Sequence, residues 1–257
     1  MLTVAMVTVG ARAVRAQQVD SLSTIEADRP DFTDGVATLA RHHLQFEGGY
    51  SYTSAGRGSG SQHSFPELLI RIGLSREVEL RLGENFLVDC GGGSAATAVK
   101  RRSGLDDVDL GTKIRLLPQR GVIPALSAEA SVTAPTGNRD VTGNKDRFLP
   151  GAALLLGWEI DRAWSAGVET FGTAMPDNGG SAIASFSVQY QAGGRWQLYE
   201  EGYVVLPLGG TEASQRYSDS GIHFFVSQDI QVDARIGWGF GPGSDRFFAG
   251  TGLAVRR

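Results

Sequence analysis

One segment of the sequence alternates between apolar and polar residues over its whole length. In IQVDARIGWGF, Ile230 to Phe240, the even-numbered residues are apolar and the odd-numbered residues are polar or glycine. Because successive side chains of a β-strand point to opposite faces, this pattern predicts a strand with one apolar and one polar face. In a soluble sheet the apolar face would cover a core. In a membrane barrel the apolar face would contact lipid, and the polar face would line the lumen.

The same alternation recurs along nearly the whole chain. Clear examples are HLQFEGGYSYT from His43, REVELRLGE from Arg76 and DDVDLGTKIRL from Asp106. With similar segments, they predict about a dozen strands of roughly ten residues, the length that a tilted transmembrane strand needs. Strands of ordinary globular proteins are shorter, nearer five or six residues on average.

The connections between these segments alternate in length. Long ones such as APTGNRDVTGNKDR are followed by short ones such as Asp161-Arg162 and AGGR. Long loops on one rim and tight turns on the other are typical of outer-membrane barrels, and a soluble β-sandwich has no reason to sort its loops in this way. The sequence therefore predicts an all-β fold, a closed up-and-down antiparallel transmembrane β-barrel of about 12 strands with both termini at the short-turn, periplasmic rim.

The N-terminal residues predict export. The stretch from Leu2 to Gly10 is apolar, and Val14-Arg15-Ala16 offers a small-residue cleavage pattern. We expect a signal peptide over 1–16, an N-terminal periplasmic or lumen segment over 17–40, and the outer-membrane barrel over 41–257. Pro30 and Gly35 exclude a regular helix in the second part.

Composition excludes some other classes of protein. The formal net charge is −4 and no basic patch interleaves with aromatic residues, so nucleic acid is not an expected partner. The single cysteine, Cys90, excludes an internal disulfide framework.

Many ionisable residues fall on the polar phase of the strands. An arginine or lysine on the lipid face would cost about 2–4 kcal/mol near the midplane, so we expect these side chains to face the lumen. The candidates are Glu47, Arg71, Glu79, Arg81, Asp107, Asp109, Lys113, Arg115, Glu129, Glu169, Asp233 and Arg235. They could form the wall of a selective, mildly acidic channel, or cross-strand ion pairs that stiffen and partly block a narrow barrel.

Aromatic residues share the predicted inner face and could offer apolar contacts to a hydrophobic solute. They are Phe171, Tyr199, Tyr203 and Phe225.

Enzymatic patterns are missing from the sequence. An outer-membrane lipase would require an oriented Ser–His pair, and the G-x-S-x-G, H-E-x-x-H and Walker motifs do not occur. We predict no enzyme, no catalytic residues, no metal and no cofactor.

The segment before the first strand carries a recognisable motif. Asp28-Arg29-Pro30-Asp31-Phe32, followed by LQFEGGYSY and later by DLGTK, resembles the opening of a bacterial outer-membrane family named Putative MetA-pathway of phenol degradation. The resemblance implies an outer-membrane location, with the lipid bilayer and the barrel-assembly machinery as partners. It also implies passive passage of small solutes, including aromatic or hydrophobic compounds. Such barrels often end on an aromatic residue that the assembly machinery recognises, whereas this chain ends Val255-Arg256-Arg257.

Three alternatives stay open from the sequence. They are a plugged structural or surface-interaction outer-membrane barrel, a soluble ligand-binding β-barrel and an outer-membrane lipase. The DRPDF segment bears on the first, because Asp28, Arg29 and Asp31 could pair with wall charges from within the lumen or at its periplasmic mouth.

Overall fold

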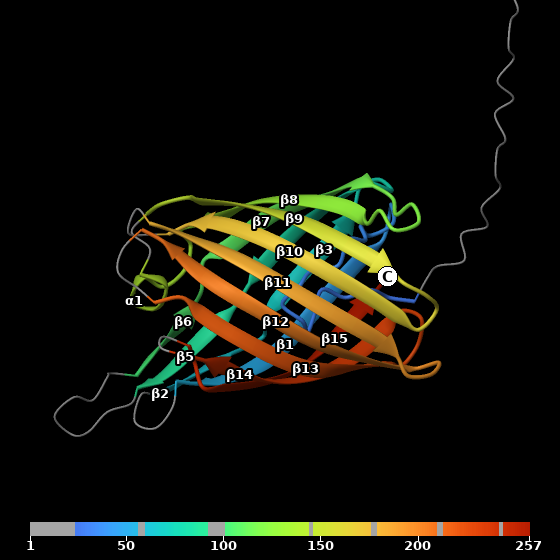
Figure 1. The fold of residues 1–257 in the computed structure, drawn as a ribbon. Helices are drawn as coiled ribbons and strands as arrows, with labels where there is room; N and C mark the ends of the chain where they lie inside the picture. The colour runs from blue at the N-terminus through green and yellow to red at the C-terminus, as the bar shows by residue number, and fades with distance from the viewer. Residues whose placement is uncertain are drawn as a thin grey trace, which may run out of the picture.

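A closed β-barrel makes up almost all of the structure. The computed structural model describes residues 24–55, 60–91, 101–143, 146–175, 179–209, 213–241 and 244–257. In this part of the chain, 15 strand segments form one antiparallel sheet whose first and last strands pair with each other (Figure 1). The predicted signal peptide lies outside the described residues.

The strand segments and the one helix of the described ranges have the following bounds. They are β1 Leu44–Ser54, β2 Gly60–Ser64, β3 Leu68–Gly73, β4 Val78–Glu84, β5 Phe86–Gly91, β6 Arg102–Leu105, β7 Val108–Leu117, β8 Ala125–Ala134, α1 Arg139–Thr142, β9 Leu149–Glu159, β10 Trp164–Ala174, β11 Gly180–Gln191, β12 Trp196–Leu208, β13 Gln215–Phe225, β14 Ile230–Phe240 and β15 Phe247–Arg256.

Three barrel strands are each broken into two segments. β2 and β3 both pair with β1, and they are separated by residues 65–67 around Pro66, which has no N–H to donate to a ladder. The next barrel strand consists of β4, which pairs with β3, and β5, which pairs with β2. The strand after it consists of β6, which pairs with β5, and β7, which pairs with β4. Counting each broken pair once gives a barrel of 12 strands, which confirms the predicted fold class.

The two ends of the barrel differ in their connections. Gln45 in β1 lies opposite Arg256 in β15, so the start of the first strand and the end of the last strand lie at the same rim. The connections 74–77, 118–124, 160–163, 192–195 and 226–229 join strands at this rim, which we call the short-turn rim. The connection that contains α1 lies at the opposite, long-loop rim (Figure 1). No helix of the described residues is long and apolar enough to cross a membrane.

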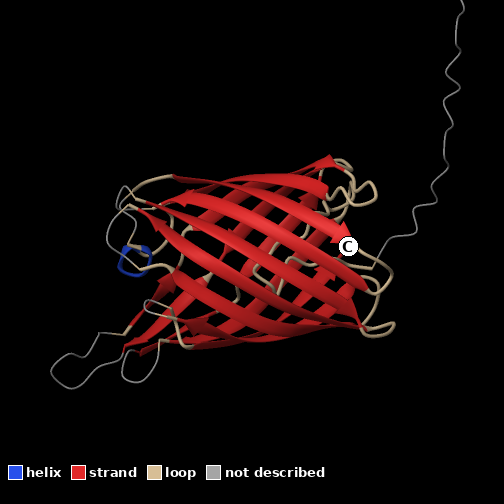
Figure 2. Cartoon of the chain, in the orientation of Figure 1, coloured by secondary structure: helices blue, strands red, loops and turns tan. Residues whose placement is uncertain are grey.

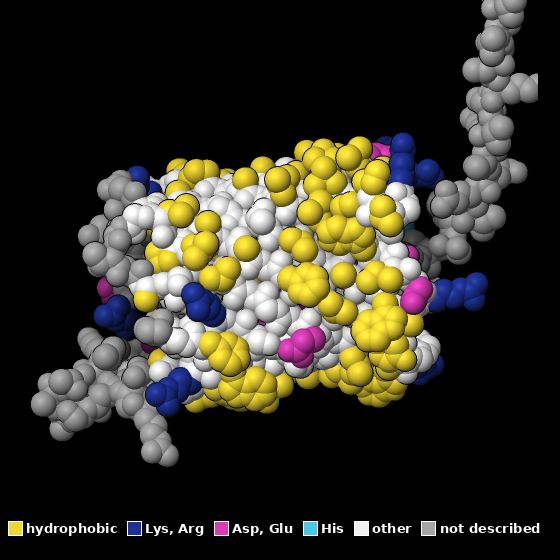
Figure 3. Space-filling view, in the orientation of Figure 1, with side chains coloured by type: hydrophobic (Ala, Val, Ile, Leu, Met, Phe, Trp, Pro, Cys, Tyr) yellow, Lys and Arg dark blue, Asp and Glu magenta, His cyan; other side chains and the backbone are white. Residues whose placement is uncertain are grey.

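The apolar faces of the strands point outward. In β14, Val232, Ile236 and Trp238 are 37%, 41% and 46% exposed, whereas Gln231 and Asp233 are 1% and 5% exposed. Hydrophobic side chains cover much of the visible outer surface (Figure 3). The alternating pattern therefore places lipid outside and the polar residues in the lumen.

Aromatic pairs lie near both ends of the strands. Trp164 packs on Tyr190, and Trp196 packs on Phe224, with ring centroids 4.6 Å and 4.4 Å apart near the short-turn rim. Trp238 packs on Phe247 near the long-loop rim. Two such belts are the aromatic girdles of an outer-membrane barrel.

The orientation of β14 gives a depth-dependent prediction. Ile236→Arg should destabilise the barrel by about 2–4 kcal/mol, because its charge would lie in hydrocarbon near the middle of the strand. Val226→Arg, in the short turn before the same strand, should cost about 0–1 kcal/mol. Urea unfolding in lipid vesicles measures both variants, and equal costs would contradict the lipid-facing orientation.

Candidate functional site

A segment without helix or strand occupies the lumen. We call residues 24–43 the inner segment; it precedes β1 and runs inside the barrel (Figure 2). Ile25 and Thr33 are 1% and 4% exposed, although neither belongs to a sheet or helix. The described part of the predicted 17–40 segment thus lies within the barrel.

The backbone amides of the inner segment are hydrogen-bonded by carboxylates of the wall. A buried N–H without a partner is costly, and an irregular segment has no regular pattern of its own to satisfy these groups. The pairs are Asp28 N–H to Glu47 (3.0 Å), Phe32 N–H to Glu201 (2.7 Å), Thr33 N–H to Glu201 (2.5 Å), Asp34 N–H to Glu169 (2.9 Å) and Leu39 N–H to Glu79 (2.6 Å). Four strands, β1, β4, β10 and β12, supply these acceptors.

The backbone carbonyls of the inner segment are matched by wall donors. The pairs are Arg71 to Glu26 O and Ala37 O (both 3.1 Å), Lys113 to Gly35 O (2.9 Å), Ser127 to Val36 O (2.6 Å), Gln231 to Arg29 O (3.2 Å) and Arg235 to Pro30 O (2.8 Å). Donors and acceptors therefore hold the segment from around the whole circumference.

Asp28 is the centre of an ion cluster. Its Oδ2 lies 3.2 Å from Arg71 and 3.1 Å from Lys113, and it also accepts a hydrogen bond from Arg81. Burial opposes ionisation of Asp28, but Arg71, Lys113 and Arg81 together hold the pKa of its carboxyl below its ordinary value. Arg81 and Lys113 also pair with wall Glu129, so the cluster joins the inner segment to β3, β4, β7 and β8.

Arg29 lies on the other side of the lumen, in a space that two glycines leave open. A Cβ added to Gly49 or Gly252 would overlap the Arg29 guanidinium. The same guanidinium pairs with Glu67 and lies 4.0 Å from Asp233. The glycines of β1 and β15 therefore make room for the arginine of the DRPDF motif.

A column of aromatic rings leads from the inner segment toward the long-loop rim. Phe32 stacks on Tyr203 at 4.4 Å, Tyr203 stacks on Tyr217 at 4.8 Å, and Tyr217 meets Phe248 edge-on at 6.0 Å. The Arg235 guanidinium lies 5.4 Å from the centre of the Phe248 ring. Phe225, another predicted inner residue, instead packs against Ile25 near the short-turn rim.

Nine of the twelve predicted lumen residues lie at the inner segment or beside the side chains that hold it. They are Glu47, Arg71, Glu79, Arg81, Lys113, Glu129, Glu169, Asp233 and Arg235. Asp107 and Asp109 lie toward the long-loop rim, where they accept from Gly137 N–H (2.8 Å) and the Thr133 hydroxyl (3.0 Å). Arg115 is exposed at the short-turn rim, where it lies opposite Ser127 in the β7–β8 ladder and lines the mouth of the lumen.

Some contacts of the inner segment were not predicted. Glu201, which accepts two of its amides, is missing from the predicted set, as are Gln231 and Ser127. Glu201 could have been found, because it shares the phase of Tyr199 and Tyr203 in β12. Gln231 and Ser127 are uncharged, so nothing in the sequence distinguishes them from other polar residues of the wall.

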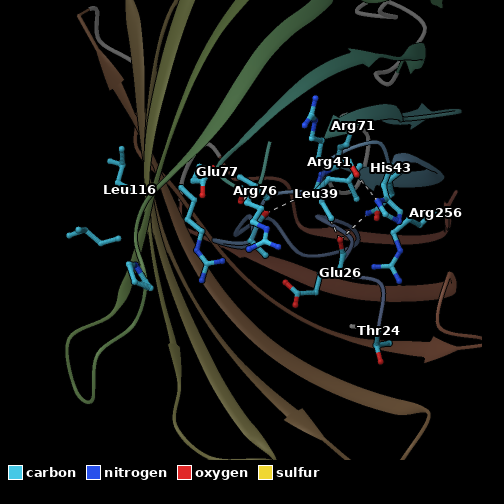
Figure 4. A pocket seen from close by; sticks show the side chains of 17 residues that line it. Thr24, Glu26, Leu39, Arg41, His43, Arg71, Arg76, Glu77, Leu116 and Arg256 are labelled. Carbon is cyan, nitrogen blue, oxygen red and sulfur yellow. Dashed lines mark hydrogen bonds between the residues drawn. The ribbon is translucent and has the colours of Figure 1, made fainter. Parts of the chain in front are cut away.

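A pocket of about 800 Å³ lies at the short-turn mouth. It is lined by wall residues Arg71 and Arg256, by Arg76 of the short turn 74–77, and by inner-segment residues Glu26 and Leu39 (Figure 4). Arg256 is held by Asp229 at 2.8 Å. Within the described ranges, no group of three or more His, Cys, Asp or Glu residues could hold a metal ion.

The lipid-facing barrel with two aromatic girdles defines the chain as a bacterial outer-membrane β-barrel protein. Residues 27–256 match the family model described as Putative MetA-pathway of phenol degradation, and the chain belongs to that family. This confirms the resemblance noted in the DRPDF, LQFEGGYSY and DLGTK segments. No curated protein sequence is significantly similar to the chain.

Solved structures share the fold at low sequence identity. An outer-membrane channel from Pseudomonas putida F1 has a TM-score of 0.69 and 13% identity, over 90% of this chain and 100% of that one. The NanC porin has a TM-score of 0.56 and 8% identity, over 82% and 98%. A KdgM porin in complex with disordered oligogalacturonate has a TM-score of 0.53 and 9% identity, over 83% and 98%.

The pairing of Glu201 with the inner segment predicts a local effect of its removal. Glu201→Leu leaves the Phe32 and Thr33 amides without acceptors, and a hydrogen bond to a charged group is worth about 1.5–3 kcal/mol. Both amides should therefore exchange with deuterium at least about tenfold faster, as measured by mass spectrometry. Glu200→Leu, one residue away on the outer face, is the matched control and should leave their exchange unchanged.

Proposed function

We propose that the protein is an outer-membrane channel for passive passage of small solutes, which the inner segment closes at rest. The main observation in support is that the barrel wall facing the inner segment is lined with charged side chains. Eight carboxylates and four cations face it: Glu47, Glu67, Glu79, Glu129, Glu169, Glu201, Asp219, Asp233, Arg71, Arg81, Lys113 and Arg235. A permanently filled barrel could be lined with apolar residues, whereas these side chains can be hydrated once the segment moves aside.

The attachment of the inner segment also supports a movable closure. Hydrogen bonds and ion pairs supply most of its contacts. The apolar ones in the described part of the chain are few: the stack of Phe32 on Tyr203, buried Leu39, and the cluster of Ile25, Phe225 and Ala254 with Ala27 packed beside it. Water can replace hydrogen bonds at a modest net cost, because the segment and the wall are then both solvated. Displacement therefore leaves no large apolar surface in water.

The aromatic column and the family description support an aromatic or hydrophobic solute. Phe32, Tyr203, Tyr217 and Phe248 offer stacked ring faces between the long-loop rim and the inner segment. A flat, uncharged aromatic compound could pack there with offset-stacked or edge-on geometry. The excess of carboxylates would disfavour anions. We assign no catalytic role to any residue, and recognition by the assembly machinery stays a prediction.

A plugged structural barrel is the second candidate. The observation that favours it is the density of pairing around Asp28, where removal of one partner would leave an uncompensated buried charge. In that case the inner segment is a permanent core that replaces the apolar interior of a soluble protein.

Planar-bilayer conductance separates the two candidates. The full chain should show only brief openings, and the variant lacking residues 20–40 should show steady, cation-preferring conductance, because the acidic wall is then hydrated. In that background, neutralising Glu79, Glu201 and Asp233 should lower the cation preference, whereas Glu200→Gln on the outer face should not. If the full chain shows no openings and passes no solutes in liposomes, the structural barrel is correct even if the shortened variant conducts, because deleting a permanent plug also opens the lumen.

A further inference from the structure

Five arginines line the pocket at the short-turn mouth. They are Arg41 of the inner segment, Arg71 of β3, Arg76 of the turn 74–77, Arg115 of β7 and Arg256 of β15. Figure 4 shows four of them, Arg41, Arg71, Arg76 and Arg256, around the same space. The volume of about 800 Å³ lies in the range of small-molecule sites, which is about 300–1,000 Å³. Separate parts of the chain thus bring five cations to one cavity large enough for a ligand.

Two of the five arginines are already neutralised. Arg71 lies 2.9 Å from Glu79, and Arg256 lies 2.8 Å from Asp229. The N–H groups of Arg71 are also used, because its two Nη atoms donate to Glu47, to Glu79 and to two backbone carbonyls of the inner segment. Both side chains therefore shape the pocket without offering a free charge.

The other three arginines have no partner in the described ranges. No ion pair and no side-chain hydrogen bond involves Arg41, Arg76 or Arg115 there. All three are exposed at the mouth. Each guanidinium carries five N–H donors in a planar fork that matches a carboxylate or a phosphate. The pocket thus holds three guanidinium groups that are free to bind an anion.

Hydrogen bonds fix the elements that carry these arginines. The Thr38 hydroxyl donates to Arg76 O at 2.8 Å, and Arg115 N–H donates to Glu77 O at 2.7 Å. Arg115 lies opposite Ser127, whose hydroxyl donates to the inner segment, so the side chain of Arg115 starts on the lumen side of β7. The inner segment, the turn and β7 are therefore held together around the cavity.

Two carboxylates also line the pocket. They belong to Glu26 and Glu77, and neither forms an ion pair with any of its arginines in the described part of the chain. Three unpaired guanidiniums against two carboxylates give only a small excess of positive charge. Non-specific attraction of anions is therefore weak, and a ligand must be held by directed hydrogen bonds from the guanidiniums.

We propose that the mouth pocket binds a small organic anion with two or more carboxylate or phosphate groups. Arg41, Arg76 and Arg115 donate to these groups, and charge-assisted bidentate hydrogen bonds supply both strength and orientation. A single acid group occupies one guanidinium, whereas a ligand with several such groups bridges the inner segment, the turn and β7.

The bound anion stays at the mouth. Behind Arg71 the lumen presents the carboxylates of Glu47 and Glu79, which repel an anion. The pocket is thus a binding site that is separate from the cation-preferring lumen. This inference rests on the pocket alone, so it stands whether or not the lumen conducts.

Isothermal titration calorimetry of the refolded full chain in detergent micelles tests the proposal. Citrate is the carboxylate probe, and fructose 1,6-bisphosphate is the phosphate probe. Acetate at the same ionic strength is the control with a single acid group. At least one of the two probes should bind saturably and at least about tenfold more tightly than acetate, because each further guanidinium contact adds charge-assisted hydrogen bonds.

Substitution of the arginines identifies the site. Arg76→Gln and Arg115→Gln should each weaken binding of the tighter probe at least about tenfold. Arg162 is exposed in another turn of the same rim and lies outside the pocket. Arg162→Gln is therefore the matched control and should leave the affinity unchanged.

Heat-modifiable migration shows that each variant still forms a barrel, as expected for exposed, unpaired side chains. A preference for citrate or for the bisphosphate identifies the acid group that the site takes. Three results would each overturn the proposal: no saturable binding of either probe, an equal affinity for acetate, or an equal loss of affinity in Arg162→Gln.

Discussion

The structure depends on one requirement: an irregular segment buried inside a barrel must find partners for every backbone N–H and C=O. The barrel strands use most of their own backbone groups in the ladder, so side chains of the wall meet most of this need. Backbone carbonyls meet the rest, as where Ile25 N–H donates to Gln228 O. Glutamates Glu47, Glu79, Glu169 and Glu201 accept the amides, and Arg71, Lys113 and Arg235 donate to the carbonyls. Charges that look like a channel wall in the sequence are, in this structure, the hydrogen-bonding groups that fix the inner segment.

This arrangement gives the two halves of the lumen different roles. Toward β3, β4 and β7, the segment is tied by the ion cluster of Asp28, where each ion is shared among several partners. Toward β14 and β15, Asp233 lies 4.0 Å from Arg29, and neither of its oxygens has a hydrogen-bond partner. Because a partly satisfied polar network is weaker than a fully satisfied one, the segment is held less firmly on the β14–β15 side, next to Arg29.

The sequence predicts the faces of the strands well and their contacts poorly. A period of two residues decides which side chains point inward, so the alternation in Ile230–Phe240 was sufficient to place Asp233 and Arg235 in the lumen. It carries no information about partners far away in the chain, such as Thr33 and Glu201, or Pro30 and Arg235. It also fails where a ladder is irregular, at the bulge after Arg115 and at the break around Pro66.

Glu200 and Glu201 illustrate the same limit within one dipeptide. Alternation requires that one of two adjacent glutamates face lipid, and the pattern of β12 alone assigns Glu201 to the side of Tyr199 and Tyr203. Inside, Glu201 accepts hydrogen bonds from the inner segment, so its charge is matched within the same chain. Outside, the two serine hydroxyls leave acceptor sites of Glu200 open in a medium that offers no donors. A single chain can complete the first environment but not the second. Glu200 therefore carries a desolvation cost that Glu201 does not.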